Sequence, residues 1–337
     1  MKRFLYHFEP KKGWMNDPNG LIEFQGQYHA FFQHNPYDIK WGPMHWGHAV
    51  SKDLVHWEEL PIALKPEEEY EDGGGCFSGS AIEKDGKLYL FYTSVSKRLG
   101  QTQSVAVSED GIHFEKYKGN PVIAQVPADG SADFRDPKVS LIDGVYYMVV
   151  GSSFEGRGRV LLYRSESLYE WDYIGVLYES EDYYDAVECP DFFQMGDTYV
   201  LMYSKIGFPT YATQFITGDF DGKKFFPKVY STPEAGPQFY AAQTFGANDG
   251  RRILIGWLYD WKMVPDQTAD SAGALSIPRE LSLKDGKICC FPVKEAQSLL
   301  ASYQGKDGEV LDVLWDEIAV EVFVNKGEHS FSYWLKN

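Results

Sequence analysis

The stretch LIEFQGQYHAFFQ, residues Leu21 to Gln33, is an apolar run, a turn containing glycine, and a second apolar run rich in aromatic residues. Four later segments repeat this arrangement: Ser80 to Ser94, Val139 to Ser152, Asp191 to Lys205 and Thr244 to Trp257. The five turn glycines are Gly26, Gly86, Gly144, Gly196 and Gly250, at separations of 60, 58, 52 and 54 residues. Such turns supply the positive φ that tight hairpins need, so the chain contains five copies of one β-hairpin.

A second signature lies between these hairpins. It reads AVSKDLVHWEEL (Ala49 to Leu60), AVSEDGIHFEKY (Ala106 to Tyr117) and YRSESLYEWDYI (Tyr163 to Ile174), with looser copies at Phe215 to Phe226 and Leu281 to Phe291. Each unit then holds about four strands, which is typical of a β-propeller blade. We therefore predict an all-β fold, a five-bladed β-propeller; the alternative is a meander of unrelated hairpins.

The last part of the chain is too short for a second full domain. Only 45 residues follow Pro292, whereas a β-sandwich needs about 100. Within them, Ala319 to Trp334 reads as a strand, a turn at Lys326-Gly327 and a second strand. The expected organisation is a propeller over residues 1–296 and a short C-terminal β segment over residues 297–337.

Composition limits the classes of partner. The chain has 32 basic and 49 acidic residues, a net charge of −17, which disfavours nucleic acid. Aromatic residues make up 16% of the chain, which suits stacking on sugars and equally suits a β core. The four cysteines form no CxxC motif, so we expect reduced thiols and no metal or other cofactor. The sequence shows no signal-peptide pattern and no apolar run long enough to span a membrane, so we expect a cytoplasmic protein without a membrane partner.

Polar residues recur near the start of the first strand of each unit. Counted back from the turn glycines, Asp17 lies nine residues away, Gln243 lies seven, and Ser78, Asp136 and Glu188 each lie eight. The first strand of a propeller blade usually lines the central channel, so these side chains are expected to converge there. Three carboxylates from three blades indicate a functional site rather than chance.

The local sequences suggest different roles for the three carboxylates. Asp17 lies between two asparagines in WMNDPNG, Arg135 is expected to keep Asp136 ionised, and Glu188 beside an apolar run should have a raised pKa. Taken singly, each has a structural explanation: an Asx-Pro turn, a surface ion pair or a partly buried Glu. Together, an ionised and a protonated carboxyl suit retaining glycoside hydrolysis. Three aromatic residues could stack on a sugar ring: Trp41, Phe77 and Trp257.

The motifs WMNDPNG, QHNP (Gln33 to Pro36), WGPMHWGHAVSKDLVHW (Trp41 to Trp57), FSGSA, FRDP, ECPD, YAAQTF and GALSIPREL together resemble glycoside hydrolase family 32, in order from about His7 to Phe291. The resemblance implies a five-bladed propeller and retaining hydrolysis of β-fructofuranosides, with a small sugar as substrate. It implies that Asp17 is the nucleophile, Asp136 the transition-state stabiliser and Glu188 the acid/base. It places eight residues in the substrate subsite: Asn16, Gln33, Trp41, Phe77, Ser78, Arg135, Tyr240 and Trp257.

The chain departs from the family pattern at its C-terminus, where the full β-sandwich is truncated. Val320 to Glu328 resembles a late strand of that module. We expect exposed apolar surface and open strand edges there, and hence a homo-oligomer, most simply a dimer, with residues 305–337 at the contact; the alternative is a monomer whose tail covers its own flank. Two alternatives to hydrolysis remain: a fructosyltransferase with the same carboxylates, and a sugar-binding propeller without catalysis.

Overall fold

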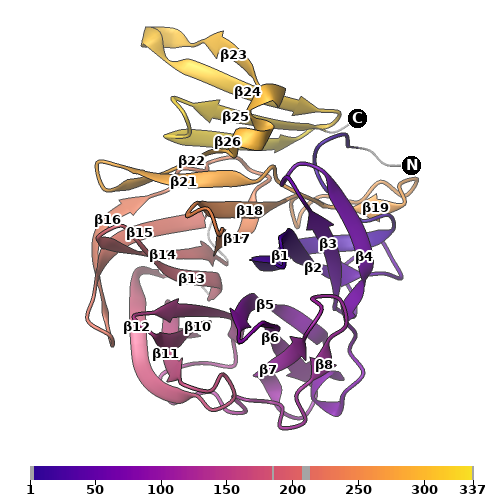
Figure 1. Ribbon diagram of the computed structural model, residues 1–337, viewed down its shortest axis with the longest axis vertical. Helices are drawn as coiled ribbons and strands as arrows, with labels where there is room; N and C mark the ends of the chain where they lie inside the picture. Colours follow the sequence, from indigo (N-terminus) through magenta and orange to yellow (C-terminus); the bar gives the residue numbers. More distant parts are fainter. Residues whose placement is uncertain (1–3, 184–185, 207–212, 336–337) are drawn as a thin grey trace.

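The computed structural model describes residues 4–183, 186–206 and 213–335. Five sheets, antiparallel except for one short added strand, surround a common centre, and a sixth sheet lies against one side of them (Figure 1). The described segments contain strands and three short 3-10 helices, in agreement with the all-β prediction.

The five central sheets are the predicted blades. The first contains β1 (Gly13–Phe24), β2 (Gln27–Asn35), β3 (His45–Ser51), β4 (Trp57–Leu64) and the added strand β19 (Ser271–Ala272). The second contains β5 (Gly75–Lys84), β6 (Lys87–Ser96), β7 (Gly100–Ser108) and β8 (Glu115–Lys116). The third contains β9 (Phe134–Ile142), β10 (Val145–Phe154), β11 (Arg157–Ser165) and β12 (Asp172–Tyr183). The fourth contains β13 (Val187–Met195), β14 (Thr198–Lys205), β15 (Thr213–Phe220) and β16 (Phe225–Ser231). The fifth contains β17 (Tyr240–Gly246), β18 (Arg252–Leu258), β20 (Ala274–Leu275), β21 (Arg279–Lys284) and β22 (Lys287–Pro292).

The first strand of each blade faces the centre. β1 contacts β5, β5 contacts β9, β9 contacts β13, β13 contacts β17, and β17 contacts β1, so the five inner strands form a closed ring. The short strand β19 pairs in parallel with β1, at Gly13↔Ser271 and Trp14↔Ala272, and ties the end of the propeller to its beginning. The inner strands can therefore bring residues far apart in the sequence to one channel.

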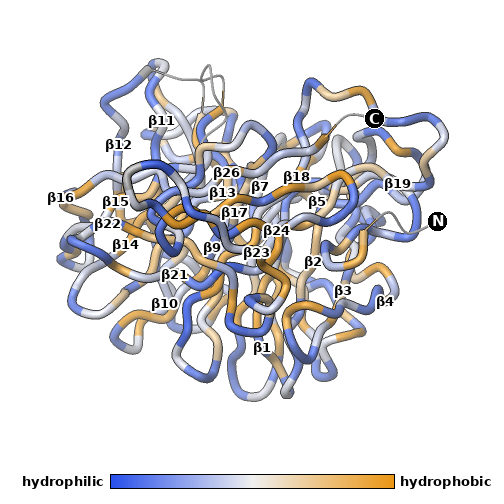
Figure 2. The backbone as a smooth tube through the Cα atoms, turned by 90° about the horizontal axis from the view of Figure 1, so that it is seen from above, coloured by the Kyte–Doolittle hydropathy of each residue, from blue (hydrophilic) through white to orange (hydrophobic). Residues whose placement is uncertain are grey.

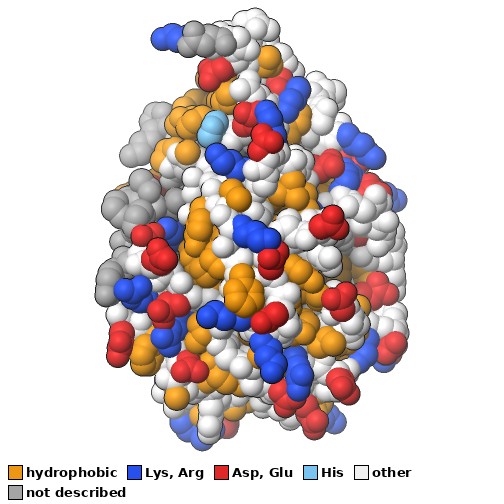
Figure 3. Space-filling view, turned by 90° about the vertical axis from the view of Figure 1, so that its left-hand side faces the viewer, with side chains coloured by type: hydrophobic (Ala, Val, Ile, Leu, Met, Phe, Trp, Pro, Cys, Tyr) orange, Lys and Arg blue, Asp and Glu red, His pale blue; other side chains and the backbone are white. Residues whose placement is uncertain are grey.

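The turns confirm the repeat. All five predicted turn glycines have positive φ, and in three blades the preceding residue does as well: Gln25 (49°), Asp85 (53°) and Asp143 (50°). Two successive positive φ values define the type I′ hairpin turn, whose twist matches that of the flanking strands. In the hydropathy view, hydrophobic segments follow the strands and the connecting turns are largely hydrophilic (Figure 2). Over the flank that carries the outer strands β12 and β16, acidic, basic and apolar side chains are interspersed (Figure 3).

The C-terminal segment is larger than the strand pair expected from the sequence. It is a four-stranded sheet of β23 (Ala301–Gln304), β24 (Val310–Asp316), β25 (Ala319–Val324) and β26 (His329–Trp334). The first two strands were not predicted; β23 is short and exposed throughout, and β24 is only partly buried. The 3-10 helix Lys294–Leu299 joins this sheet to blade five, and the expected boundary at 296/297 falls inside that helix. The two remaining 3-10 helices are Glu69–Glu71 and Lys306–Gly308.

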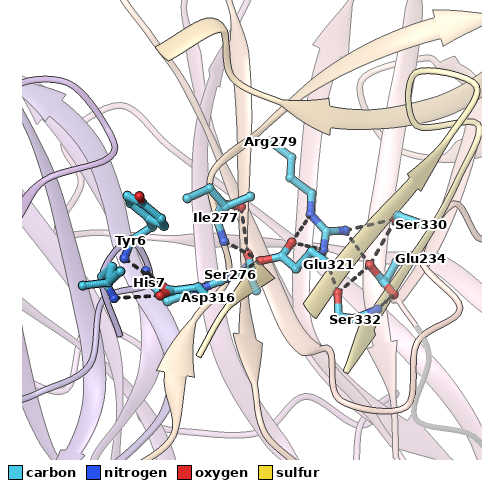
Figure 4. Close-up of polar contacts among 12 residues, drawn as sticks. Tyr6, His7, Glu234, Ser276, Ile277, Arg279, Asp316, Glu321, Ser330 and Ser332 are labelled. Carbon is cyan, nitrogen blue, oxygen red and sulfur yellow. Dashed lines mark hydrogen bonds and ion pairs between the residues drawn. The ribbon is translucent and has the colours of Figure 1, made fainter. Parts of the chain in front are cut away.

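A buried polar network attaches this sheet to the propeller and to the N-terminal segment (Figure 4). His7 Nδ1 lies 2.9 Å from Asp316 Oδ2, and His7 Nε2 lies 2.8 Å from Glu321 Oε1. The other oxygen of Glu321 accepts a hydrogen bond from Arg279 Nη2 at 2.6 Å. Arg279 also pairs with Glu234. The C-terminal sheet therefore packs on its own propeller, through side chains that are almost fully buried.

Candidate active site

Every inner strand carries a β-bulge at the same level of the channel. The strand pairing shifts register between Met15 and Pro18, Cys76 and Gly79, Arg135 and Lys138, Glu188 and Asp191, and Tyr240 and Gln243. Bulges bend a strand and re-aim its side chains, and they are frequent beside active sites. In three blades a residue of the bulge has a left-handed backbone: Asp136 (φ 65°), Cys189 (φ 47°) and Ala241 (φ 51°).

The bulges correct the single shared register expected from the sequence. Arg135, Glu188 and Tyr240 occupy one level, because each is the last paired residue before its bulge. Asp136 lies one position further on, and Asp17 and Ser78 lie two positions further on, between the flanking pairs of their own bulges. Gln243 comes after the bulge of β17, so it does not share the level of the carboxylates. The candidate site therefore draws its side chains from different positions of the bulges on the five inner strands, not from one shared position.

Asp17 is held at both carboxylate oxygens. Asn16 Nδ2 donates to Oδ1 at 2.9 Å, and Ser78 Oγ donates to Oδ2 at 2.6 Å. Trp14 Nε1 in turn donates to Asn16 Oδ1 at 2.7 Å, which fixes the orientation of the amide. The thiol of Cys189 lies 3.6 Å from Asp17 Oδ2. These donors orient one carboxylate edge while the side chain lines the pocket.

Glu188 lies between two donors from the neighbouring blades. Arg135 Nε donates to Oε1 at 3.2 Å, and the Tyr240 hydroxyl donates to Oε2 at 2.5 Å. Burial raises the pKa of the Glu188 carboxyl, against the opposing charge of Arg135, and the Asp17 charge raises it further. The raised pKa predicted for Glu188 from the sequence agrees with this arrangement.

Asp136 differs from the expectation that Arg135 keeps it ionised. The Asp136 side chain is buried, and burial raises the pKa of its carboxyl to about 7 in spite of Arg135. The guanidinium of Arg135 is shared with other acceptors, since Nη1 donates to Asp133 Oδ1 at 2.7 Å and Nε donates to Glu188. The backbone N–H of Cys189 donates to Asp136 Oδ2 at 2.8 Å. Because the Asp136 and Glu188 carboxyls are buried close to each other, both keep their protons to a higher pH than isolated carboxyls do.

The three carboxyls line a pocket of about 340 Å³ at one mouth of the channel. The other predicted residues in its lining are Asn16, Gln33, Trp41, Phe77, Ser78 and Arg135. Trp41 is 48% exposed and meets Phe77 edge-on, with ring centroids 6.0 Å apart. Gln33 Nε2 donates to the carbonyl of Cys76, so the strands of two blades are joined behind the pocket. The pocket volume of about 340 Å³ falls within the range of sites that bind small molecules.

Two predicted substrate residues do not line this pocket. Trp257 is fully buried and packs against Trp14 and Trp261. Trp261, rather than Trp257, lines the pocket. Tyr240 is also outside the lining, but it contacts Glu188 through its hydroxyl.

Three residues of the lining were not predicted from the sequence: Gln101, Asp133 and Trp261. Asp133 had a detectable signal, because it precedes Arg135 by two residues and side chains two apart share a face of an extended segment. Gln101 had none, since its strand is not an inner strand.

Within the described residues, no group of three or more His, Cys, Asp or Glu side chains is arranged to hold a metal ion. The four cysteines are free and buried. Among the same residues, the structure has no helix of the length and apolarity that crossing a membrane requires. The chemistry that the pocket offers is that of paired carboxyls, one held by two neutral donors and one between an arginine and a tyrosine.

Comparisons with known proteins identify the family of the chain. A sucrose-6-phosphate hydrolase of Escherichia coli is 42% identical over 320 residues, which cover 89% of this chain and 66% of that protein. A levanase of Bacillus subtilis is 38% identical over 330 residues, covering 87% of this chain and 47% of the relative. The chain thus spans at most about two thirds of the length of these curated relatives. A Bombyx mori GH32 β-fructofuranosidase mutant in complex with sucrose aligns over 99% of this chain and 89% of its own, with a TM-score of 0.87 and 33% identity. Residues 7–292 match the model of the glycosyl hydrolases family 32 N-terminal domain, and the chain belongs to this family.

Proposed function

We propose that the chain is a retaining glycoside hydrolase that cleaves β-fructofuranosides, such as sucrose, sucrose 6-phosphate or short fructans. The observation that carries the proposal is the pairing of a carboxylate fixed by Asn16 and Ser78 with a carboxyl of raised pKa in one pocket. A retaining enzyme needs these two states in two neighbouring carboxyl groups.

In the first step, Asp17 attacks the anomeric carbon of the fructosyl unit while Glu188 gives its proton to the glycosidic oxygen. The glycosidic bond breaks, the alcohol leaves, and a fructosyl ester of Asp17 forms. In the second step, Glu188 takes a proton from water, and the water oxygen displaces Asp17 with a second inversion. Asp136 would bind fructose hydroxyls and steady the positive charge of the transition state, and Trp41 and Phe77 would contact the sugar ring.

The first test measures products. Equal glucose and free fructose from sucrose indicate hydrolysis, whereas a fructose deficit indicates transfer to another sugar. A panel of sucrose, sucrose 6-phosphate and short fructans, assayed side by side, identifies the preferred substrate. Absence of cleavage across the whole panel would contradict the proposal and favour a sugar-binding propeller.

The second test separates the roles. We expect Glu188→Gln to reduce kcat on sucrose by about 10²–10⁴-fold and to reduce it less on an aryl fructoside, whose leaving group needs little protonation. Asp17→Asn should lose activity on both substrates, because the nucleophile is absent. Asp143→Asn, in the exposed turn after β9, is the matched control and should leave kcat unchanged. Near-normal turnover by Asp17→Asn would refute the assignment.

A further inference from the structure

The propeller channel has a second pocket, of about 390 Å³, beyond the bulges. All five inner strands run in the same direction around the ring, so residues after each bulge lie towards the opposite mouth. The pocket is lined by such residues: Leu21 and Ile22 of β1, Ala81 and Ile82 of β5, Val139 to Ile142 of β9, Phe193 and Gln194 of β13, and Thr244 to Gly246 of β17. We call it the distal pocket. Phe193 is five residues after Glu188 along β13, so at about 3.3 Å per residue the level of the distal pocket is roughly 16 Å from Glu188.

Two cationic side chains, Lys138 and Arg252, line the distal pocket, and the described lining contains no carboxylate. Both pair with the same buried carboxylate beneath the pocket: Lys138 Nζ and Arg252 Nη2 each lie 3.2 Å from an oxygen of Asp191. Burial lowers the pKa of Lys138, which also donates to the Thr244 carbonyl, while the charge of Asp191 opposes that shift. Two basic side chains therefore face one carboxylate, and an anion in the pocket would balance the second of them.

The guanidinium of Arg252 is held rigidly, with hydrogen-bonding capacity left over. Its Nε donates to Thr244 Oγ1 at 2.7 Å, and its plane lies over the ring of Phe193, 3.8 Å from the centroid. Its remaining terminal nitrogen, Nη1, has no hydrogen-bond acceptor among the residues that the structure describes. A preorganised guanidinium with one unoccupied terminal nitrogen can still donate a charge-assisted hydrogen bond to a carboxylate.

We propose that the distal pocket binds a small organic monoanion, a carboxylate with an apolar body. One negative charge neutralises the excess of Lys138 and Arg252 over Asp191. The apolar walls, among them Ile82, Leu141 and Phe245, would cover the rest of the molecule. The site is separate from the carboxyl pocket and does not depend on the proposed hydrolysis.

The test is calorimetric titration of the intact chain with benzoate as the probe and benzamide as its neutral analogue. We expect one benzoate per chain, no binding of benzamide, and no displacement of benzoate by fructose. Arg252→Gln should abolish binding. No detectable binding of benzoate, equal binding of benzamide, or displacement of benzoate by fructose would each overturn the proposal.

A second variant covers the case in which Arg252→Gln does not fold, since Arg252 also holds Asp191. Leu141 is 55% exposed and lines the distal pocket, so a charge can be added there with little effect on packing. Leu141→Glu should weaken benzoate binding about tenfold or more by repulsion, whereas Leu141→Gln, of the same size, should weaken it much less. Equal affinities of the two variants for benzoate would overturn the electrostatic basis of the site.

Discussion

Tyr240 donates a hydrogen bond to Glu188 without lining the pocket. Burial raises the pKa of Glu188, while Arg135 and the hydrogen bond from Tyr240 lower it. Tyr240→Phe removes that donor, so we expect the pKa of Glu188 to rise further. Because the acid must be protonated for the first step, the alkaline limb of the kcat/KM profile on sucrose should move to higher pH. The pH profile of the purified variant measures this shift.

Tyr303→Phe is the matched control for this experiment. Tyr303 is 57% exposed on β23, in the C-terminal sheet outside the propeller ring, so its variant should keep the parent profile. A Tyr240→Phe profile with an unmoved alkaline limb, or one moved to lower pH, would contradict the role of Tyr240.

At the scale of single residues, the sequence predicted the three carboxyls that meet in one pocket, but it could not predict which side chains packing would cover. Asp17, Asp136 and Glu188 could be found because each stands at a similar distance from a turn glycine, and the structure brings them to one pocket. The choice between Trp257 and Trp261 could not be made from the sequence, because Trp257 ends the same inner hairpin that Trp261 closely follows. Only the packing of Trp257 against Trp14 shows which of the two indoles is covered.

At the scale of the element, each inner strand must lie close to the second strand of its blade at the bulge. A Cβ on Gly79, in β5, would lie 1.9 Å from the carbonyl oxygen of Phe91 on β6. Gly79→Ala must therefore push the two strands apart beside Ser78, which holds Asp17. We expect a loss of about 1–3 kcal/mol of stability, together with reduced kcat. Urea unfolding and sucrose assays on the same preparation measure both.

Gly246→Ala is the control for Gly79→Ala. It lies at the end of β17, where the nearest atom to an added Cβ is Arg252 Nη1, at the ordinary contact distance of 3.7 Å. Its urea midpoint should stay close to that of the parent protein. If Gly79→Ala unfolds at the same urea concentration as Gly246→Ala, β5 and β6 can move apart at the bulge without the expected loss of stability.

The hairpins were predictable, and the bulges were not. An Asp-Gly pair such as Asp85-Gly86 predicts its turn through its own backbone preference. A bulge is defined by the residues that the partner strand places opposite it, as Ser94 opposite Cys76 and Tyr92 opposite Gly79 show. Counting from turn glycines therefore brought Gln243 into a register that pairing does not support.

At the scale of the whole molecule, the homodimer expected through residues 305–337 stays a prediction, as does the cytoplasmic location; the last two residues of that range lie outside the described part. The C-terminal sheet packs on its own propeller, but its outer face keeps Trp315 63% exposed and Tyr303 57% exposed. The edge of β23 is also exposed along its length. Light scattering should give a dimer mass that Trp315→Glu reduces to a monomer mass. A monomer mass at all concentrations would contradict the dimer.

The attachment of that sheet should depend on pH through His7. Burial alone would lower the pKa of His7, but its bonds to Asp316 and Glu321 outweigh it and raise the pKa to about 9. A histidine whose pKa is raised on folding stabilises the fold fully below its ordinary pKa of about 6.5. The contribution declines as the pH rises and is lost as the pH passes through 9. The intact protein should therefore lose stability between pH 6.5 and pH 9.

His7→Gln removes the titrating group and keeps a polar side chain in its place. At pH 6 we expect the variant to be less stable by about 3 kcal/mol, because Asp316 and Glu321 lose a buried cationic partner. At pH 9.5 the parent histidine is largely neutral, so the difference between the two proteins should shrink. Urea unfolding of both proteins at each pH measures the two differences. His113→Gln is the control, because His113 is exposed and also pairs with an aspartate.

Asp316 also accepts hydrogen bonds from the backbone N–H groups of residues 5 to 7. The N-terminal segment should therefore loosen together with the sheet, and hydrogen exchange there should accelerate in the same pH range. A gap between parent and variant that is equal at pH 6 and pH 9.5 would show that His7 acts by packing and hydrogen bonding alone, without its charge.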